Sequence, residues 1–132
     1  MKLFLDSSAI IDFFSGDTLI RNRIHAADKI CTSAVCAYEV LIGERYNELK
    51  GLKSSYARVS QFFDEIETLP FAYLNSIKAS ELSAKLILKG KKVNGLDVMI
   101  AAQAIAENAC LLTKDSDFKV IQGAAPELVL DR

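Results

Sequence analysis

Short apolar runs alternate along the chain with segments in which hydrophobic residues recur every three or four positions. The short runs predict buried strands, and the periodic segments predict amphipathic helices. The predicted strands are residues 2–6, 29–32, 69–71, 110–113 and 127–130. Because helical patterns fill the intervals between them, the chain is predicted to form an α/β fold whose parallel sheet is covered by helices on both faces.

Several helix starts are marked by residues that cap helices through a side-chain oxygen. Ser7 or Ser8 is predicted to cap a first helix that begins near Ala9, and Asp17 a second. Ser33 is predicted to cap a long helix that Gly51 interrupts. The stripe expected on one face of that helix contains Val35, Tyr38 and Ile42. The segment 96–108 is apolar on nearly every side, which predicts a buried helix.

The composition favours one globular domain spanning all 132 residues, 51% of which are hydrophobic. With a net charge of −1, the chain has no overall attraction for nucleic acid, so an RNA-binding role would depend on a local patch. No apolar run is long enough for a signal-peptide core or a membrane span. Three cysteines in apolar contexts are expected to be reduced and buried, which predicts a cytoplasmic protein that does not bind membranes.

Four carboxylates occupy equivalent positions in the predicted sheet. Asp6 ends the first strand, and Asp115 follows the fourth. Glu39 lies in the second turn of the helix after the second strand, and Asp97 lies in the first turn of the buried helix. Because the carboxyl ends of parallel strands meet at one edge of the sheet, where such folds bind ligands, these four groups are expected to converge.

Each acid also has a local explanation. Asp6 could belong to a helix-capping cluster, and Asp97 could complete a capping box with Asn94. Glu39 could be a solvated helix residue, and the sequence around Asp115 and Asp117 could be a simple turn. Taken together, however, clustered and partly buried carboxylates repel one another and are costly to desolvate. A hard cation such as Mg²⁺ or Mn²⁺ would relieve that repulsion, which favours phosphoester chemistry.

Other chemistries have less support in the sequence. With His25 as its single histidine, the chain offers little for a histidine-based triad or a multi-histidine zinc centre. A zinc site made from His25 and the three cysteines would need a long-range coincidence, because no CxxC pair is present. The glycine patterns of nucleotide-binding loops are also absent.

Three segments, in this order, resemble the PIN-domain ribonucleases and, among them, the VapC toxins of toxin–antitoxin pairs. The segments are LFLDSSAIIDFF, TSAVCAYEVLIGE and GLDVMIAAQAIAENACLLTKDSDF, and together they extend over most of the chain. The last is the strongest match, with an Asp that opens an Ala-rich helix and a strand that ends in Thr-x-Asp-x-x-Phe. Two departures concern the edge of the site: Ser7 stands where the family often has Thr, and Asn94-Gly95 where it often has Pro.

The resemblance implies a three-layer α/β/α sandwich and a divalent-metal-dependent endoribonuclease that acts on tRNA or rRNA. It also implies a homodimer and a VapB-like antitoxin that inserts a C-terminal segment into the acidic groove. The implied acidic quartet is Asp6, Glu39, Asp97 and Asp115. Asp6, Asp97 and Asp115 would be Mg²⁺ or Mn²⁺ ligands, and Glu39 would be a ligand or would orient the attacking water. Ser8 and Thr113 would support the site, and Asp117 would be either a secondary, water-mediated ligand or a helix cap. Phe118 is expected to anchor the turn in the core.

Three other functions remain possible from the sequence. One is a PIN nuclease of RNA processing that is not a toxin, and another is a degenerate, non-catalytic PIN interaction module. A phosphoacceptor receiver domain fits poorly, because a single Asp follows the first strand and no Asp follows the third. Basic residues could form an RNA-binding rim or could be solvated helix ends; they are Arg21, Arg23, Lys50, Lys53, Lys89, Lys91 and Lys92.

Overall fold

A computed structural model describes residues 1–131 and contains five strands and seven helices in that range. The strands are β1 (Lys2–Leu5), β2 (Lys29–Ser33), β3 (Glu67–Leu69), β4 (Cys110–Leu112) and β5 (Val129–Asp131). The helices are α1 (Ser7–Phe14), α2 (Thr18–Ala26), α3 (Ala34–Leu49), α4 (Tyr56–Glu65), α5 (Tyr73–Leu88), α6 (Gly95–Ala106) and α7 (Asp117–Ala124).

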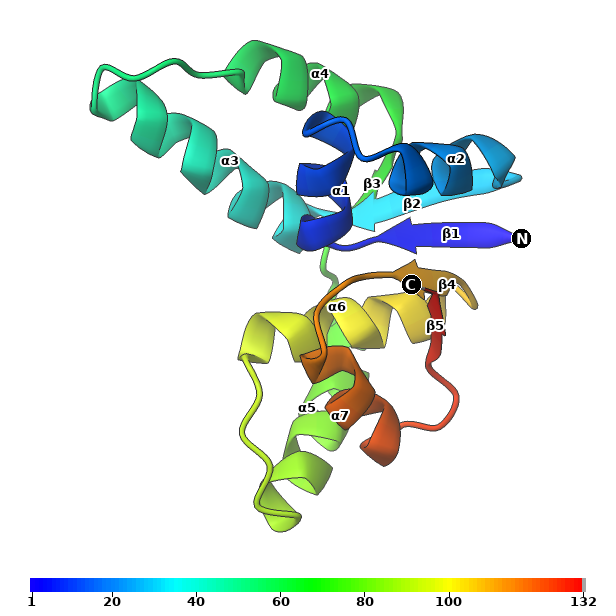
Figure 1. The fold of residues 1–132 in the computed structure, drawn as a ribbon. Helices are drawn as coiled ribbons and strands as arrows, with labels where there is room; N and C mark the ends of the chain where they lie inside the picture. The colour runs from blue at the N-terminus through cyan, green and yellow to red at the C-terminus, as the bar shows by residue number, and fades with distance from the viewer. Residues whose placement is uncertain (132) are drawn as a thin grey trace.

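The five strands form one parallel sheet in the order β3-β2-β1-β4-β5. The chain moves outward from β1 to β3 and then crosses back to β4 and β5 on the other side. Because parallel crossovers are right-handed, this reversal puts the two sets of helices on opposite faces. Figure 1 shows α1 to α4 on one side of the sheet and α5 to α7 on the other. The predicted α/β architecture with a central parallel sheet is therefore confirmed.

The core lies around the two central strands. Phe4 and Leu5 of β1 and Leu111 and Leu112 of β4 are completely shielded from solvent, and burial of each such side chain stabilises the fold by about 2 to 3 kcal/mol. Helix α6 is enclosed as predicted, with seven of its residues buried. Phe118 is 1% exposed and anchors the start of α7, as expected.

Two predictions about helices are wrong. The cap of α1 is Asp6, whose side chain accepts a hydrogen bond from the Ala9 N–H, rather than Ser7 or Ser8. On α3, Tyr38 is 59% exposed and Ile42 is 49% exposed. The residues of α3 that are buried are Val35, Cys36 and Val40. The reason is that α3 extends beyond the sheet, so only its first turns meet the core (Figure 1).

Other differences are shifts of boundaries. Strand β3 ends at Leu69, so residues 70 and 71, which were predicted as strand, lie in the connection to α5. The break at Gly51 is confirmed, because α3 ends at Leu49 and Gly51 has a φ of +74°. The three cysteines are buried and unpaired, as expected. Within residues 1–131, every helix is too short or too polar to cross a membrane.

Candidate active site

The predicted acids meet where the sheet reverses its direction of winding. Asp6 follows β1 and Asp115 follows the neighbouring strand β4. From these points the chain leaves toward opposite faces, into α1 and α7 respectively (Figure 1). Parallel α/β folds bind ligands at such a switch point, because the diverging connections leave a crevice there.

Asp6 lies directly after β1, beside this switch point, and is 3% exposed. Its Oδ1 accepts hydrogen bonds from the Ala9 N–H and from Ser8 Oγ, both at 2.8 Å, and its Oδ2 accepts one from Thr113 Oγ1. Burial raises the pKa of Asp6, and the three hydrogen bonds oppose that rise because they favour the charged form. Ser8 and Thr113 thus both contact Asp6, and the helix-capping role of Asp6 coexists with its place in the site.

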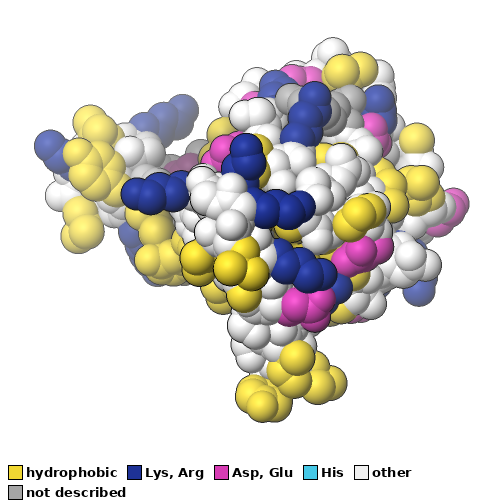
Figure 2. Space-filling view, turned by 90° about the horizontal axis from the view of Figure 1, so that it is seen from below, with side chains coloured by type: hydrophobic (Ala, Val, Ile, Leu, Met, Phe, Trp, Pro, Cys, Tyr) yellow, Lys and Arg dark blue, Asp and Glu magenta, His cyan; other side chains and the backbone are white. Residues whose placement is uncertain are grey.

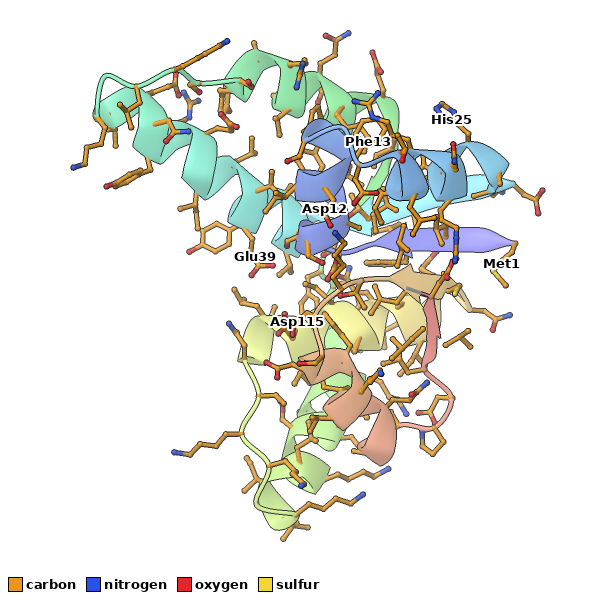
Figure 3. All side chains as sticks on the ribbon, viewed as in Figure 1. Met1, Asp12, Phe13, His25, Glu39 and Asp115 are labelled. Atoms are coloured by element: carbon orange, nitrogen blue, oxygen red, sulfur yellow. The ribbon has the colours of Figure 1, made fainter. Side chains whose placement is uncertain are left out.

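Glu39 is half-buried rather than freely solvated. Its Oε1 accepts a hydrogen bond of 2.6 Å from Ser7 Oγ, which fixes the carboxylate against the start of α1. Figure 3 shows Glu39 on α3 and Asp115 on the connection from β4 to α7, both at the same end of the sheet. The sequence did not predict the hydrogen bond between Ser7 and Glu39. Its only indication was the position of Ser7 next to Asp6.

Asp97 is the acid in this group whose surroundings disfavour its charged form most clearly. The cap of α6 is Asn94, which accepts the Leu96 N–H at 2.9 Å, and no capping-box bond between Asp97 and Asn94 forms in the described chain. Asp97 is 9% exposed. Burial, followed by the charges of Asp115, Glu39, Asp117 and Asp6, raises its pKa to about 7. The charges of the four other acids therefore all act on Asp97.

The turn from residue 113 to residue 117 carries two of these acids. The Asp115 N–H donates to Thr113 Oγ1 at 3.0 Å, and the Asp117 N–H donates to Asp115 Oδ1 at 2.9 Å. Carboxylate oxygens of Asp97, Asp115 and Asp117 lie within 4.8 Å of one another. Asp117, which the sequence ranked below Asp115, therefore joins the group, whereas Asp6 lies outside it. Asp117 is the first residue of α7 rather than its cap.

This donor set fits a hard divalent cation. It consists of carboxylate oxygens alone, which is the ligand chemistry that Mg²⁺ and Mn²⁺ prefer. Among the described residues, Asp97, Asp115 and Asp117 are the acidic side chains that lie close enough together to share one ion. His25 is exposed on α2 and the cysteines are buried elsewhere, so no zinc site of the kind weighed above assembles in that range.

The basic residues considered for an RNA-binding rim have varied surroundings. Lys89 donates to the Gly123 carbonyl at 3.2 Å, and Arg21 lies over the ring of Phe13. Lys91 and Lys92 are exposed in the connection that leads to α6. Figure 2 shows Lys and Arg side chains interspersed with acidic ones over the face formed by α5 to α7.

Known protein families and curated proteins match this chain over most of its length. The model of the PIN domain family matches residues 3–124. Ribonuclease VapC5 from Mycobacterium tuberculosis (strain ATCC 25618 / H37Rv) is 27% identical over 121 residues, which span 92% of this chain and 88% of that protein.

Solved structures match over almost the full length. One is VapBC-5 from Mycobacterium tuberculosis, a member of the VapBC family of toxin–antitoxin systems. It matches with a TM-score of 0.68 and 25% identity, covering 99% of this chain and 98% of that one. DNA-bound VapBC from Salmonella typhimurium matches with a TM-score of 0.80 and 24% identity, covering 99% and 97%. The second match, at lower identity, concerns the fold alone.

Proposed function

The chain belongs to the PIN domain family, and from that premise we propose that it is a VapC-type endoribonuclease, the toxin of a toxin–antitoxin pair. One observation carries the proposal: the carboxylate oxygens of Asp97, Asp115 and Asp117 lie within 4.8 Å of one another. Burial and the neighbouring acids raise the pKa of Asp97 to about 7. Such an arrangement costs folding free energy, and carboxylates perturbed in this way are typical of functional sites. The likeness to VapC5 supports the same activity.

We propose that Asp97, Asp115 and Asp117 hold a divalent cation, Mg²⁺ or Mn²⁺, with Asp6 as a further ligand directly or through water. When bound, such an ion activates a water molecule and stabilises negative charge on phosphate oxygens. The close approach of the first three carboxylates supports this choice. The buried position of Asp6 beside them supports its inclusion.

The other polar groups would orient the reactants. Glu39, fixed by Ser7, would either complete the ligand set or hold the attacking water by accepting a hydrogen bond from it. Ser8 and Thr113 would keep Asp6 in place through their hydroxyl groups. The substrate that suits this site is an RNA phosphodiester, in tRNA or rRNA, and the exposed Lys91 and Lys92 are candidates for contacts with its backbone.

We further propose a cytoplasmic homodimer that a VapB-like antitoxin inhibits. The likeness to VapBC-5, a member of the VapBC family of toxin–antitoxin systems, at 25% identity over nearly the whole chain, supports such a partner. A basic side chain of the antitoxin would complement the negative charge of the clustered acids.

The decisive experiment is cleavage of total cellular RNA by the purified protein, with Mg²⁺ or Mn²⁺ and with chelator. Asp97→Asn should lower the cleavage rate by about a hundredfold or more, because metal-assisted stabilisation amounts to several kcal/mol. Asp64→Asn, which makes the same change in an exposed carboxylate of α4, should cleave normally. Mapping of the product ends would identify the RNA and the cleavage site. Full activity of Asp97→Asn would refute the assigned site.

A second experiment separates the toxin from its alternatives. Expression of the wild-type chain should arrest growth, and co-expression of a small neighbouring reading frame should relieve the arrest. Cleavage without arrest would favour a nuclease of RNA processing. Arrest that persists in Asp97→Asn, in the absence of cleavage, would favour a non-catalytic interaction module.

A further inference from the structure

Lys114 lies between two residues of the acidic turn, Thr113 and Asp115, but its ammonium contacts other elements. Lys114 Nζ lies 2.7 Å from Asp12 Oδ2 on α1 and 3.3 Å from Asp17 Oδ2 at the start of α2. One side chain thus links the acidic turn to two helices of the opposite layer. Figure 3 shows Asp12 on α1, in the layer opposite α7.

The two partners differ in what holds them in place. Asp12 Oδ2 is shielded from solvent and has no well-aligned hydrogen bond in the described chain, so its contact with Lys114 is mainly electrostatic. Asp17 caps α2 by accepting the Ile20 N–H at 3.1 Å. A carboxylate oxygen that is removed from water needs a compensating charge. Lys114 supplies that charge to Asp12 and is in turn fixed by it.

At its backbone, Lys114 is part of the turn that presents the acids. The Lys114 N–H donates to Ser8 Oγ at 3.2 Å, and Ser8 Oγ donates to Asp6. The hydrogen bonds from the Asp115 and Asp117 amides close the turn immediately afterwards. Any movement of Lys114 would therefore displace the two aspartates that face Asp97.

We propose that Lys114 is a positioning residue for the acidic site: its ion pairs with Asp12 and Asp17 fix the turn 113–117 so that Asp115 and Asp117 stay opposite Asp97. Like charges in this group repel one another and would drive the turn away from α6. An anchor of opposite charge on α1 and α2 resists that movement. The consequence for cation binding rests on the function proposed above, whereas the consequence for the turn does not.

The test for the turn is amide hydrogen exchange, measured by NMR on the full chain in chelator. Lys114→Met removes the charge and keeps most of the length of the side chain, and Lys114→Arg keeps the charge. In Lys114→Met, the amides of Asp115 and Asp117 should exchange about three- to tenfold faster, as expected for the loss of two partly exposed ion pairs. Lys114→Arg should restore slow exchange. Lys119→Met, an exposed lysine of α7 with no ion pair found in the described chain, is the matched control.

The test for the site is Mn²⁺ binding, measured by calorimetry on the same variants. The dissociation constant should rise about three- to tenfold in Lys114→Met and stay unchanged in Lys114→Arg and Lys119→Met. Adding Asp12→Asn to Lys114→Met should cause little further change, because the two variants remove the same contact. If Lys114→Met fails to fold, Asp17→Asn replaces it, since Asn can still cap α2 while its ion pair is lost.

Unchanged amide exchange in Lys114→Met would overturn the proposal. So would a faster-exchanging turn that binds Mn²⁺ with wild-type affinity, because the ion pairs would then hold the turn without affecting the site. If the wild-type chain neither binds Mn²⁺ nor cleaves RNA, the proposed function fails, and the exchange rates still decide whether Lys114 fixes the turn.

Discussion

At the scale of single residues, Asp97 is the acid whose ionisation costs the fold most. Its carboxylate is buried, has no hydrogen-bond donor within residues 1–131, and lies near four other acids. Its pKa is about 7, against an ordinary value near 3.8. Between these two values the unfolded chain ionises Asp97 and the folded chain does not. The stability contributed by this group is therefore highest at acidic pH and falls as pH rises from about 4 to 7.

Without divalent cations, Asp97→Asn should consequently be more stable than the wild type at pH 8. The expected gain in the free energy of unfolding is on the order of 2 to 4 kcal/mol, and it should shrink toward zero near pH 4. Urea denaturation in chelator across this pH range measures it. Asp64→Asn, at an exposed site on α4, should show a difference that stays flat with pH. A gain that does not shrink toward acidic pH would contradict the assigned cause.

Asp115 and Asp117 provide a second comparison of single residues. Both belong to the close group with Asp97, but Asp115 also accepts the Asp117 N–H through its side chain and so holds the turn together. Asp115→Ala should abolish detectable cleavage, because it removes a ligand charge together with the acceptor that closes the turn. Asp117→Ala should weaken Mn²⁺ binding by about tenfold and leave some cleavage, because it removes one ligand charge and keeps the turn. Mn²⁺-binding and cleavage assays on both variants check this order. An equal loss of cleavage in both variants would show that Asp115 and Asp117 contribute equally to the site.

At the scale of elements, Gln103 ties the buried helix α6 to its neighbours. Its side chain is 2% exposed, accepts a hydrogen bond from Ser33 Oγ and donates one of 3.0 Å to the Pro70 carbonyl. Ser33 in turn caps α3 by accepting the Val35 N–H at 2.9 Å. The start of α3, which carries Glu39, therefore depends on a polar group inside an otherwise apolar helix.

Gln103→Leu should lower the free energy of unfolding by about 1 to 3 kcal/mol, because it leaves the buried Ser33 hydroxyl without its acceptor and removes the donor to the Pro70 carbonyl. Gln61→Leu, which removes an exposed bond to Glu65 on α4, should change it by less than about 0.5 kcal/mol. Urea denaturation of both variants provides the measurement. If the two changes cost the same, Gln103 has no special role in fixing α3.

The sequence predicted helices and strands correctly where the local pattern of hydrophobic residues matches their burial in the fold. The enclosed strands β1 and β4 and the apolar helix α6 were found because their surroundings are uniform along their length. The core-facing stripe of α3 was not, because a helix that runs past the sheet leaves Tyr38 and Ile42 outside the core, and only tertiary structure shows where the sheet ends. The convergence of the acids was expected because the carboxyl ends of parallel strands meet at one edge of the sheet. The contacts of Ser7 and Lys114 depend on side-chain geometry between distant segments.

At the scale of the whole molecule, the acidic site joins the two helical layers. Asp6 and Glu39 come from the layer of α1 to α4, and Asp97 and Asp117 from the layer of α5 to α7. Repulsion between these acids acts across the sheet and opposes the association of the layers. The contact between α3 and α6 and the ion pairs of Lys114 work against it.

A divalent cation should therefore stabilise the entire fold and not just its site. A ligand that binds the folded chain at a hundred times its dissociation constant contributes about 2.7 kcal/mol, which should raise the thermal midpoint of a chain of this size by several degrees. Calorimetry in chelator and in excess Mn²⁺ measures the shift, and Asp64→Asn should retain it. Asp97→Asn and Asp115→Asn should lose most of it, because each removes ligand charge from the close group. An undiminished shift in both variants would mean that the stabilising ion binds elsewhere and that these acids do not hold it.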